Sequence, residues 1–89
     1  MLYLVSYDLR GGSPADYQEL YAAFNGFDDC RKCLESSWLV KSDKTCREVR
    51  DILQAKMKPE DLIIVVPYGE ARSAWIESDV VDWVHKYQP

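Results

Sequence analysis

The sequence predicts a single α+β domain spanning residues 1–89, in which amphipathic helices pack on one antiparallel sheet. Two apolar runs rich in β-branched or aromatic residues lie at 2–9 and 62–66 and indicate strands. Two helix-capping signals, at Ser13 and Thr45, are each followed by apolar residues at helical spacing. A hydrophobic fraction of 47% suits one compact core and argues against a disordered chain.

The first strand is predicted over residues 2–9, so that Asp8 stands where a buried strand meets a glycine-containing loop. A helix follows, because Ser13 is a favourable N-cap and Pro14 suits the first helical position. Gly26 is expected to end this helix in a left-handed conformation. The apolar face of the helix is expected to consist of Tyr17, Leu20, Tyr21 and Phe24.

Residues 30–42 are interpreted as two short strands, or one long strand bent at Ser36-Ser37, because their apolar positions do not keep a helical period. Trp38 is expected in the core. On an extended segment Cys30 and Cys33 point to opposite faces, which disfavours a shared metal ion. Three cysteines without a secretory signal indicate reduced thiols.

A second helix is predicted after residue 45, because Thr45 and Glu48 match a capping box, and Pro59 marks its expected end. The positions at helical spacing that are expected to form its buried stripe are Val49, Ile52, Leu53 and Met57. Three basic residues, Arg47, Arg50 and Lys58, are expected on its outer side, either as a solvated face or as a surface that contacts phosphates.

The run at 62–66 is apolar at every position, which predicts a central strand or one that a partner buries. An irregular segment from residue 69 to residue 77 follows, and it carries Trp75. Ser78 is expected to cap a last helix. The apolar face of that helix is expected to comprise Val80, Trp83, Val84 and Tyr87.

The order of these elements predicts a ferredoxin-like βαββαβ domain with an additional C-terminal helix. Both helices of that unit would cover one face of the sheet, which leaves the other face apolar and in need of a cover. The C-terminal helix or a second copy of the chain is expected to supply it. We therefore expect a homodimer, with Ile64, Val66 and Trp75 at its interface.

The net charge of −4 is unevenly distributed, because residues 31–58 carry a local excess of +4 and the flanks carry −8. An acidic protein has no overall field that attracts nucleic acid, so only the middle segment offers phosphate contacts. No apolar run is long enough to cross a bilayer, and no signal peptide is evident. The expected location is the cytoplasm, without a membrane association.

Three segments, Val5–Leu9, Ser36–Val40 and Asp61–Val65, resemble the SinR-like proteins of bacteria and phages. That family is similar to the small CRISPR adaptation subunit and more remotely to VapD-type toxins. The resemblance implies a ferredoxin-like protomer that dimerises. It also implies that Asp8, which ends a Ser-Tyr-Asp strand, holds Mg²⁺ together with the Asp8 of a second copy. Mg²⁺ needs only one or two carboxylates besides water and phosphate, and its bound water is a nucleophile for phosphodiesters.

Two functions follow from these observations. The first is a small homodimeric interaction protein of prokaryotic mobile-element or defence biology, nuclease-like in fold and without efficient catalysis, that binds a protein partner. The second is a Mg²⁺-dependent endonuclease acting on RNA or DNA. In that case Asp8 is catalytic, Ser6 or Ser37 orients the phosphate, and the bases that contact the backbone are Arg10, Arg47, Arg50 and Lys58. The acidic flanks favour the first function, because they suit a protein partner better than DNA. The competing interpretation of Asp8 is an acid that caps the following loop or pairs with Arg10.

Overall fold

The computed structural model describes residues 1–89. Its elements are β1 (Leu2–Asp8), α1 (Pro14–Phe24), β2 (Asp29–Leu34), β3 (Ser37–Lys41), α2 (Cys46–Gln54), β4 (Leu62–Pro67) and α3 (Ser78–Tyr87). The strands form one sheet in the order β2-β3-β1-β4, and all neighbouring strands are antiparallel. The predicted α+β class and four-stranded antiparallel sheet are confirmed, and the arrangement is compatible with a ferredoxin-like fold.

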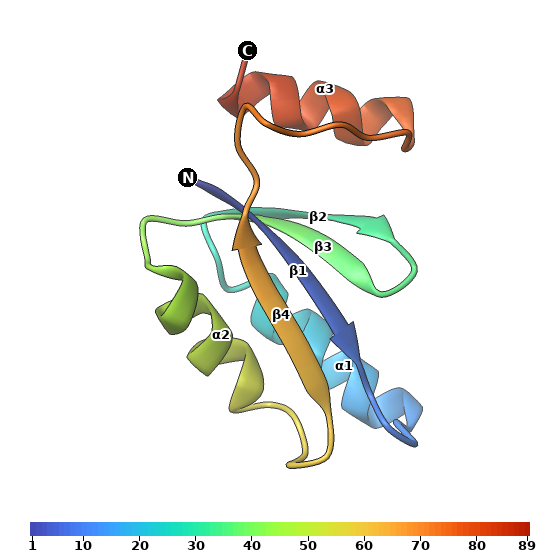
Figure 1. Ribbon diagram of the computed structural model, residues 1–89. Helices are drawn as coiled ribbons and strands as arrows, with labels where there is room; N and C mark the ends of the chain where they lie inside the picture. The colour runs from blue at the N-terminus through green and yellow to red at the C-terminus, as the bar shows by residue number, and fades with distance from the viewer.

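The first face of the sheet is covered by α1 and α2 (Figure 1). Both helices begin with a capping box, in which the Ser13 or Thr45 hydroxyl accepts a hydrogen bond from a backbone N–H three residues later. The main core lies beneath them and consists of Tyr3, Val5, Tyr7, Leu9, Leu20, Phe24, Trp38, Val40, Val49 and Leu53. Alternate residues of β1 enter this core, as expected for a strand with two different faces.

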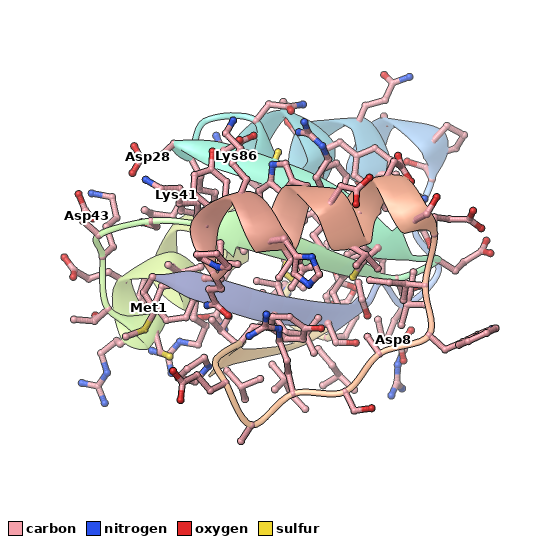
Figure 2. The ribbon with its side chains drawn as sticks, turned by 90° about the horizontal axis from the view of Figure 1, so that it is seen from above. Met1, Asp8, Asp28, Lys41, Asp43 and Lys86 are labelled. Atoms are coloured by element: carbon pink, nitrogen blue, oxygen red, sulfur yellow. The ribbon has the colours of Figure 1, made fainter.

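The second face of the sheet is covered by α3, which lies on the opposite side from α1 and α2 (Figure 1). Its apolar face packs on β1, β2 and β3 and forms a smaller core of Leu2, Leu39, Val80, Trp83 and Val84, against which Cys33 of β2 also packs. Figure 2 shows α3 across the sheet, with Met1 and Asp8 at opposite ends of β1. Because one short helix is narrower than four strands, part of this face stays uncovered.

The strand β4 lies at the edge of the sheet, which excludes a central strand, the first of the two alternatives that the sequence predicted. Ile63 and Val65 are half-buried on the helix side, whereas the alternate residues point to the uncovered side. Those residues are Leu62, Ile64 and Val66, which are 52%, 64% and 41% exposed. The strand β4 is therefore apolar on both faces, although the helices cover only one of them and the other is exposed in the monomer.

The left-handed conformation predicted for Gly26 at the end of the first helix is also wrong. The helix α1 ends at Phe24, and Asn25 after it keeps a right-handed conformation. Gly26 is not left-handed, since Gly11, at φ +62°, is the only residue with positive φ. The Gly26 N–H donates to the Ala23 carbonyl at 3.1 Å, which continues the right-handed turn. The left-handed position is needed instead in the tight loop after β1.

The other two helices also differ from expectation in detail. The helix α2 ends at Gln54, earlier than Pro59, because the chain then tightens into short turns. Ile52 is 38% exposed and does not belong to the buried stripe. The N-cap of α3 is Glu77 rather than Ser78, and no side chain caps that helix. Its stability therefore depends on packing.

The three cysteines are free. The prediction that Cys30 and Cys33 point to opposite faces of the sheet is confirmed. Cys30 packs against the core beneath α1 and α2, whereas Cys33 packs against the core beneath α3. None of the three helices has the length and apolarity that a membrane-spanning helix needs.

Candidate functional site

Asp8 ends β1 on the face that α1 and α2 do not cover. Its side chain is 61% exposed, and its Oδ2 accepts a hydrogen bond from Arg10 Nε at 3.0 Å. This pair is the ion pair that the sequence offered as the simpler interpretation of Asp8. An exposed pair of this kind contributes little to stability, so the carboxylate is free to exchange partners.

Asp61 is the carboxylate beside Asp8 that the sequence analysis missed. Its two oxygens accept hydrogen bonds from the backbone N–H groups of Arg10 and Lys58, each at 2.8 Å. Lys58 Nζ in turn donates to the Arg10 carbonyl at 3.0 Å and lies 3.5 Å from Asp16 Oδ2. These bonds tie the loop after β1 to the loop before β4, and they bring Arg10 and Lys58 to the same end of the sheet as Asp8.

Ser6 and Ser37 face each other across the β1–β3 pair. The Ser37 hydroxyl donates to the Ser6 hydroxyl at 3.1 Å, and Ser6 is exposed whereas Ser37 is 8% exposed. Because side chains alternate along a strand, Ser6 lies on the same face as Asp8. The structure therefore places Asp8, Ser6 and Ser37 on one face.

Arg47 and Arg50 lie on α2, which covers the opposite face. Arg50 is paired with the adjacent Asp51, with Nη2 at 2.9 Å from Oδ1. Lys58 lies beyond the end of α2, so the three bases do not form one helix stripe. The expected phosphate-contacting surface is therefore divided between the two faces, and only Arg10 and Lys58 lie near Asp8.

At Asp8 one chain would offer a metal ion a single carboxylate ligand. Asp61 uses both of its oxygens on backbone N–H groups, which leaves Asp8 as the available carboxylate. No group of three or more His, Cys, Asp and Glu side chains is arranged to hold a metal. The donor set reaches two carboxylates when a second copy brings its own Asp8 to the same place.

Asp29, at the start of β2, fastens α3 to the sheet, and the sequence analysis did not single it out. Its Oδ2 accepts hydrogen bonds from Trp83 Nε1 at 3.0 Å and from the Tyr87 hydroxyl. Its Oδ1 accepts from the Cys30 N–H at 2.9 Å and pairs with Arg31 at 3.2 Å. Burial alone would raise the pKa of Asp29, but the hydrogen bonds from Tyr87 and Trp83 outweigh it and hold that pKa below its usual value.

The uncovered part of the second face forms an apolar strip, which we define as Leu62, Ile64 and Val66 of β4. The register of β1 and β4 sets Ile64 opposite Ser6 and Leu62 opposite Asp8. The strip therefore runs directly beside the polar residues of the candidate site. Trp75, in the segment that leads to α3, is 100% exposed.

The largest hollow in the surface lies away from Asp8, between α3 and the segment that precedes it. It measures about 510 Å³ and is lined in part by Glu70, Arg72 and His85. Arg72 Nη1 donates to the Gly69 carbonyl at 3.0 Å and to Gln88 Oε1 at 2.7 Å. Because the Arg72 guanidinium already donates hydrogen bonds within the chain, it is not free to bind a ligand in the hollow.

Comparison with protein-family models and with curated proteins finds no match to this sequence. The apolar strip and the polar residues beside it are therefore the features that bear on function.

Proposed function

We propose that the protein is a small interaction module that pairs with a second copy of itself over the apolar strip. The observation that carries the proposal is the exposure of Leu62, Ile64 and Val66 on one face of an edge strand. Adjacent exposed apolar residues of this kind mark interaction sites. A second copy is the favoured occupant because none of these three residues carries a charge, so two identical strips meet without direct repulsion.

The proposal keeps the ferredoxin-like protomer and the role in prokaryotic mobile-element or defence biology that the SinR-like resemblance implies. The dimer would then engage a further protein partner, which suits its acidic character better than nucleic acid does. The three free thiols support a cytoplasmic location, where disulfides are rare.

Sedimentation velocity across a micromolar concentration series tests the self-association. The wild-type protein is expected to form dimers, and Ile64→Lys is expected to be monomeric because it places a charge in the strip. Ile52→Lys is the matched control, since Ile52 is exposed on α2, on the other side of the sheet. A wild-type protein that stays monomeric throughout the series, or an Ile52→Lys variant that dissociates as Ile64→Lys does, would contradict the proposal.

A Mg²⁺-dependent endonuclease is the second candidate, and the position of Asp8 favours it. Asp8 and Ser6 are exposed and stand opposite Leu62 and Ile64 in the sheet. A two-fold contact over the strip whose axis passes near Leu62 would bring together the ends of β1 from both copies. Arg10 and Lys58 would then be the bases nearest to a phosphodiester bound there, and Ser6 or Ser37 would orient it.

Cleavage of labelled single-stranded RNA and double-stranded DNA, with Mg²⁺ or Mn²⁺, tests the second candidate. Cleavage is expected to require the metal ion and to disappear in Asp8→Ala. Asp28→Ala serves as the matched control, because Asp28 is an exposed acid at a different place in the fold. Cleavage that persists in Asp8→Ala would come from a contaminant and would exclude this candidate, as would the absence of cleavage by the wild-type dimer.

A further inference from the structure

Two features beside the apolar strip are complementary to each other. One is the side chain of Trp75, which is wholly exposed. The other, which we call the groove, is an apolar depression of about 270 Å³ on the second face of the sheet. Its main lining residues are Leu4, Leu34, Leu39, Tyr68 and Ile76. Each feature leaves apolar surface in water, which is unfavourable unless something covers it.

The size of the groove suits a single aromatic side chain. A cavity of roughly 150 Å³ accepts one benzene ring, whereas drug-sized ligands occupy about 300–1,000 Å³. At about 270 Å³ the groove lies between these values, so an indole ring, which is larger than benzene and smaller than a drug-sized ligand, suits it. The lining is almost wholly apolar, so it offers no charge to a polar ligand.

Trp75 borders the groove but does not fill it. The next residue, Ile76, lines the groove and packs against the core beneath α3. This contact holds the chain with Ile76 toward the sheet while Trp75 stays in solvent.

We propose that Trp75 of each copy inserts into the groove of the other copy. This inference rests on the self-association proposed above and specifies how the two copies are joined. A two-fold dimer makes every contact twice, so one exposed Trp and one empty groove on each chain satisfy each other. The two Trp75 side chains would bury about 300–500 Å² together. A stable interface needs about 1,600 Å² in total, so the apolar strip would have to supply much of the remaining area. The strip is continuous with the contact between Trp75 and the groove, which we call the joint, because Leu4 lines the groove and pairs with Val66.

The thiol of Cys33 provides a direct test, because Cys33 also lines the groove. Its alkylation by iodoacetamide is measured by peptide mass spectrometry at rising protein concentration, in the wild type, in Trp75→Ala and in Trp75→Phe. Burial raises the pKa values of the Cys33 and Cys30 thiols, so the reaction is run above neutral pH. Cys30, which packs on the opposite side of the sheet, is the internal control.

The wild-type Cys33 is expected to react about tenfold more slowly when about nine-tenths of the protein is dimeric, since only free copies then react. Trp75→Ala is expected to remove this protection and Trp75→Phe to keep part of it, while the rate at Cys30 stays constant. If Cys33 were alkylated at the same rate in the dimeric wild type and in Trp75→Ala, the insertion of Trp75 into the groove would be contradicted and the proposed dimer would not. Protection of Cys33 from alkylation that does not depend on protein concentration would also contradict the insertion, because it would place Trp75 in the groove of the same chain. A wild type that is monomeric by sedimentation would overturn the proposed dimer and the joint together.

Discussion

At the scale of single residues, the carboxylates Asp8, Asp29 and Asp61 have different roles because their neighbours differ. Asp61 and Asp29 each accept several hydrogen bonds and join segments that lie far apart in the sequence. Asp8 has one exposed partner, Arg10, and is the acid of the three that is open to solvent and to a second molecule. The structural acids are therefore Asp29 and Asp61, and the candidate functional acid is Asp8.

The attachment of α3 is expected to depend on the charge of Asp29. Its pKa is lowered in the folded protein, so its contribution to stability is present above the unfolded value of 3.8 and is lost as the pH falls through the lower folded value. Asp29→Asn is expected to lower the free energy of unfolding by about 1–3 kcal/mol at neutral pH, because one of the two acceptor oxygens becomes an NH₂ group and the donors on that side lose their acceptor. Urea unfolding followed by tryptophan fluorescence measures both effects.

The difference between wild type and Asp29→Asn is expected to shrink as the medium becomes strongly acidic. Asp16 and Glu48 also have lowered pKa values, through hydrogen bonds to the backbone N–H groups of Ser13 and Thr45, and they affect both proteins equally. Asp28→Asn is the control, since Asp28 is exposed and adjacent in sequence. If the difference in the free energy of unfolding between wild type and Asp29→Asn did not depend on pH, the charge of the carboxylate would not contribute to the attachment of α3.

At the scale of elements, the three helices are held in different ways. The helices α1 and α2 carry capping boxes and bury Leu20, Phe24, Val49 and Leu53, whereas α3 has no side-chain cap. Local sequence therefore determines where α1 and α2 begin. The position of α3 depends on its packing over β1, β2 and β3 and on the hydrogen bonds to Asp29.

Removal of the α2 cap is expected to destabilise the domain by about 1 kcal/mol, as is typical when an N-cap hydroxyl is lost. Thr45→Ala removes the acceptor for the Glu48 N–H, which lies 3.2 Å from the Thr45 hydroxyl. Thr45→Ser keeps the hydroxyl and is expected to resemble the wild type. Thermal unfolding followed by circular dichroism measures the change. A loss of stability of the same size in both variants would assign the effect to the methyl group of Thr45 instead.

At the scale of the whole molecule, the bases of α2 and the apolar strip lie on different sides of the sheet. The bases Arg47 and Arg50 stand on α2, whereas the apolar strip and Trp75 belong to the side that α3 partly covers. The chain carries −4 overall, so two copies repel each other at long range. A dimer formed over the strip is therefore held by apolar contact against this repulsion.

Self-association is accordingly expected to persist or strengthen when NaCl is raised from about 50 mM to about 500 mM, because salt screens the repulsion between exposed charges. Sedimentation velocity at both salt concentrations gives the dissociation constants. The Arg50→Ala variant is expected to behave as the wild type does, since α2 lies on the other side of the sheet. Dimers that dissociate on addition of salt would point to a charged interface in place of the strip.

The parts of the fold and site that could be predicted from the sequence are those with a local signal. An apolar, aromatic-rich run and capping residues placed β1, α1 and α2, and the Asp8–Arg10 pair joins residues that are two positions apart. The hydrogen bonds of Asp61 to Arg10 and of Asp29 to Tyr87 cross 51 and 58 positions. No local pattern marks such pairs, because they exist only once the sheet has formed.

The amino-acid sequence by itself determined the class of fold and the beginnings of the first two helices, because these depend on periodicity and on contacts within a few residues. The tertiary structure alone decided that β4 is an edge strand, that α3 covers only part of the second face, and that Arg47 and Arg50 are separated from Asp8. An apolar run predicts that a strand is to be covered, but only the packing of the whole chain shows which side chains remain in water. For this protein those side chains are the apolar strip and Trp75.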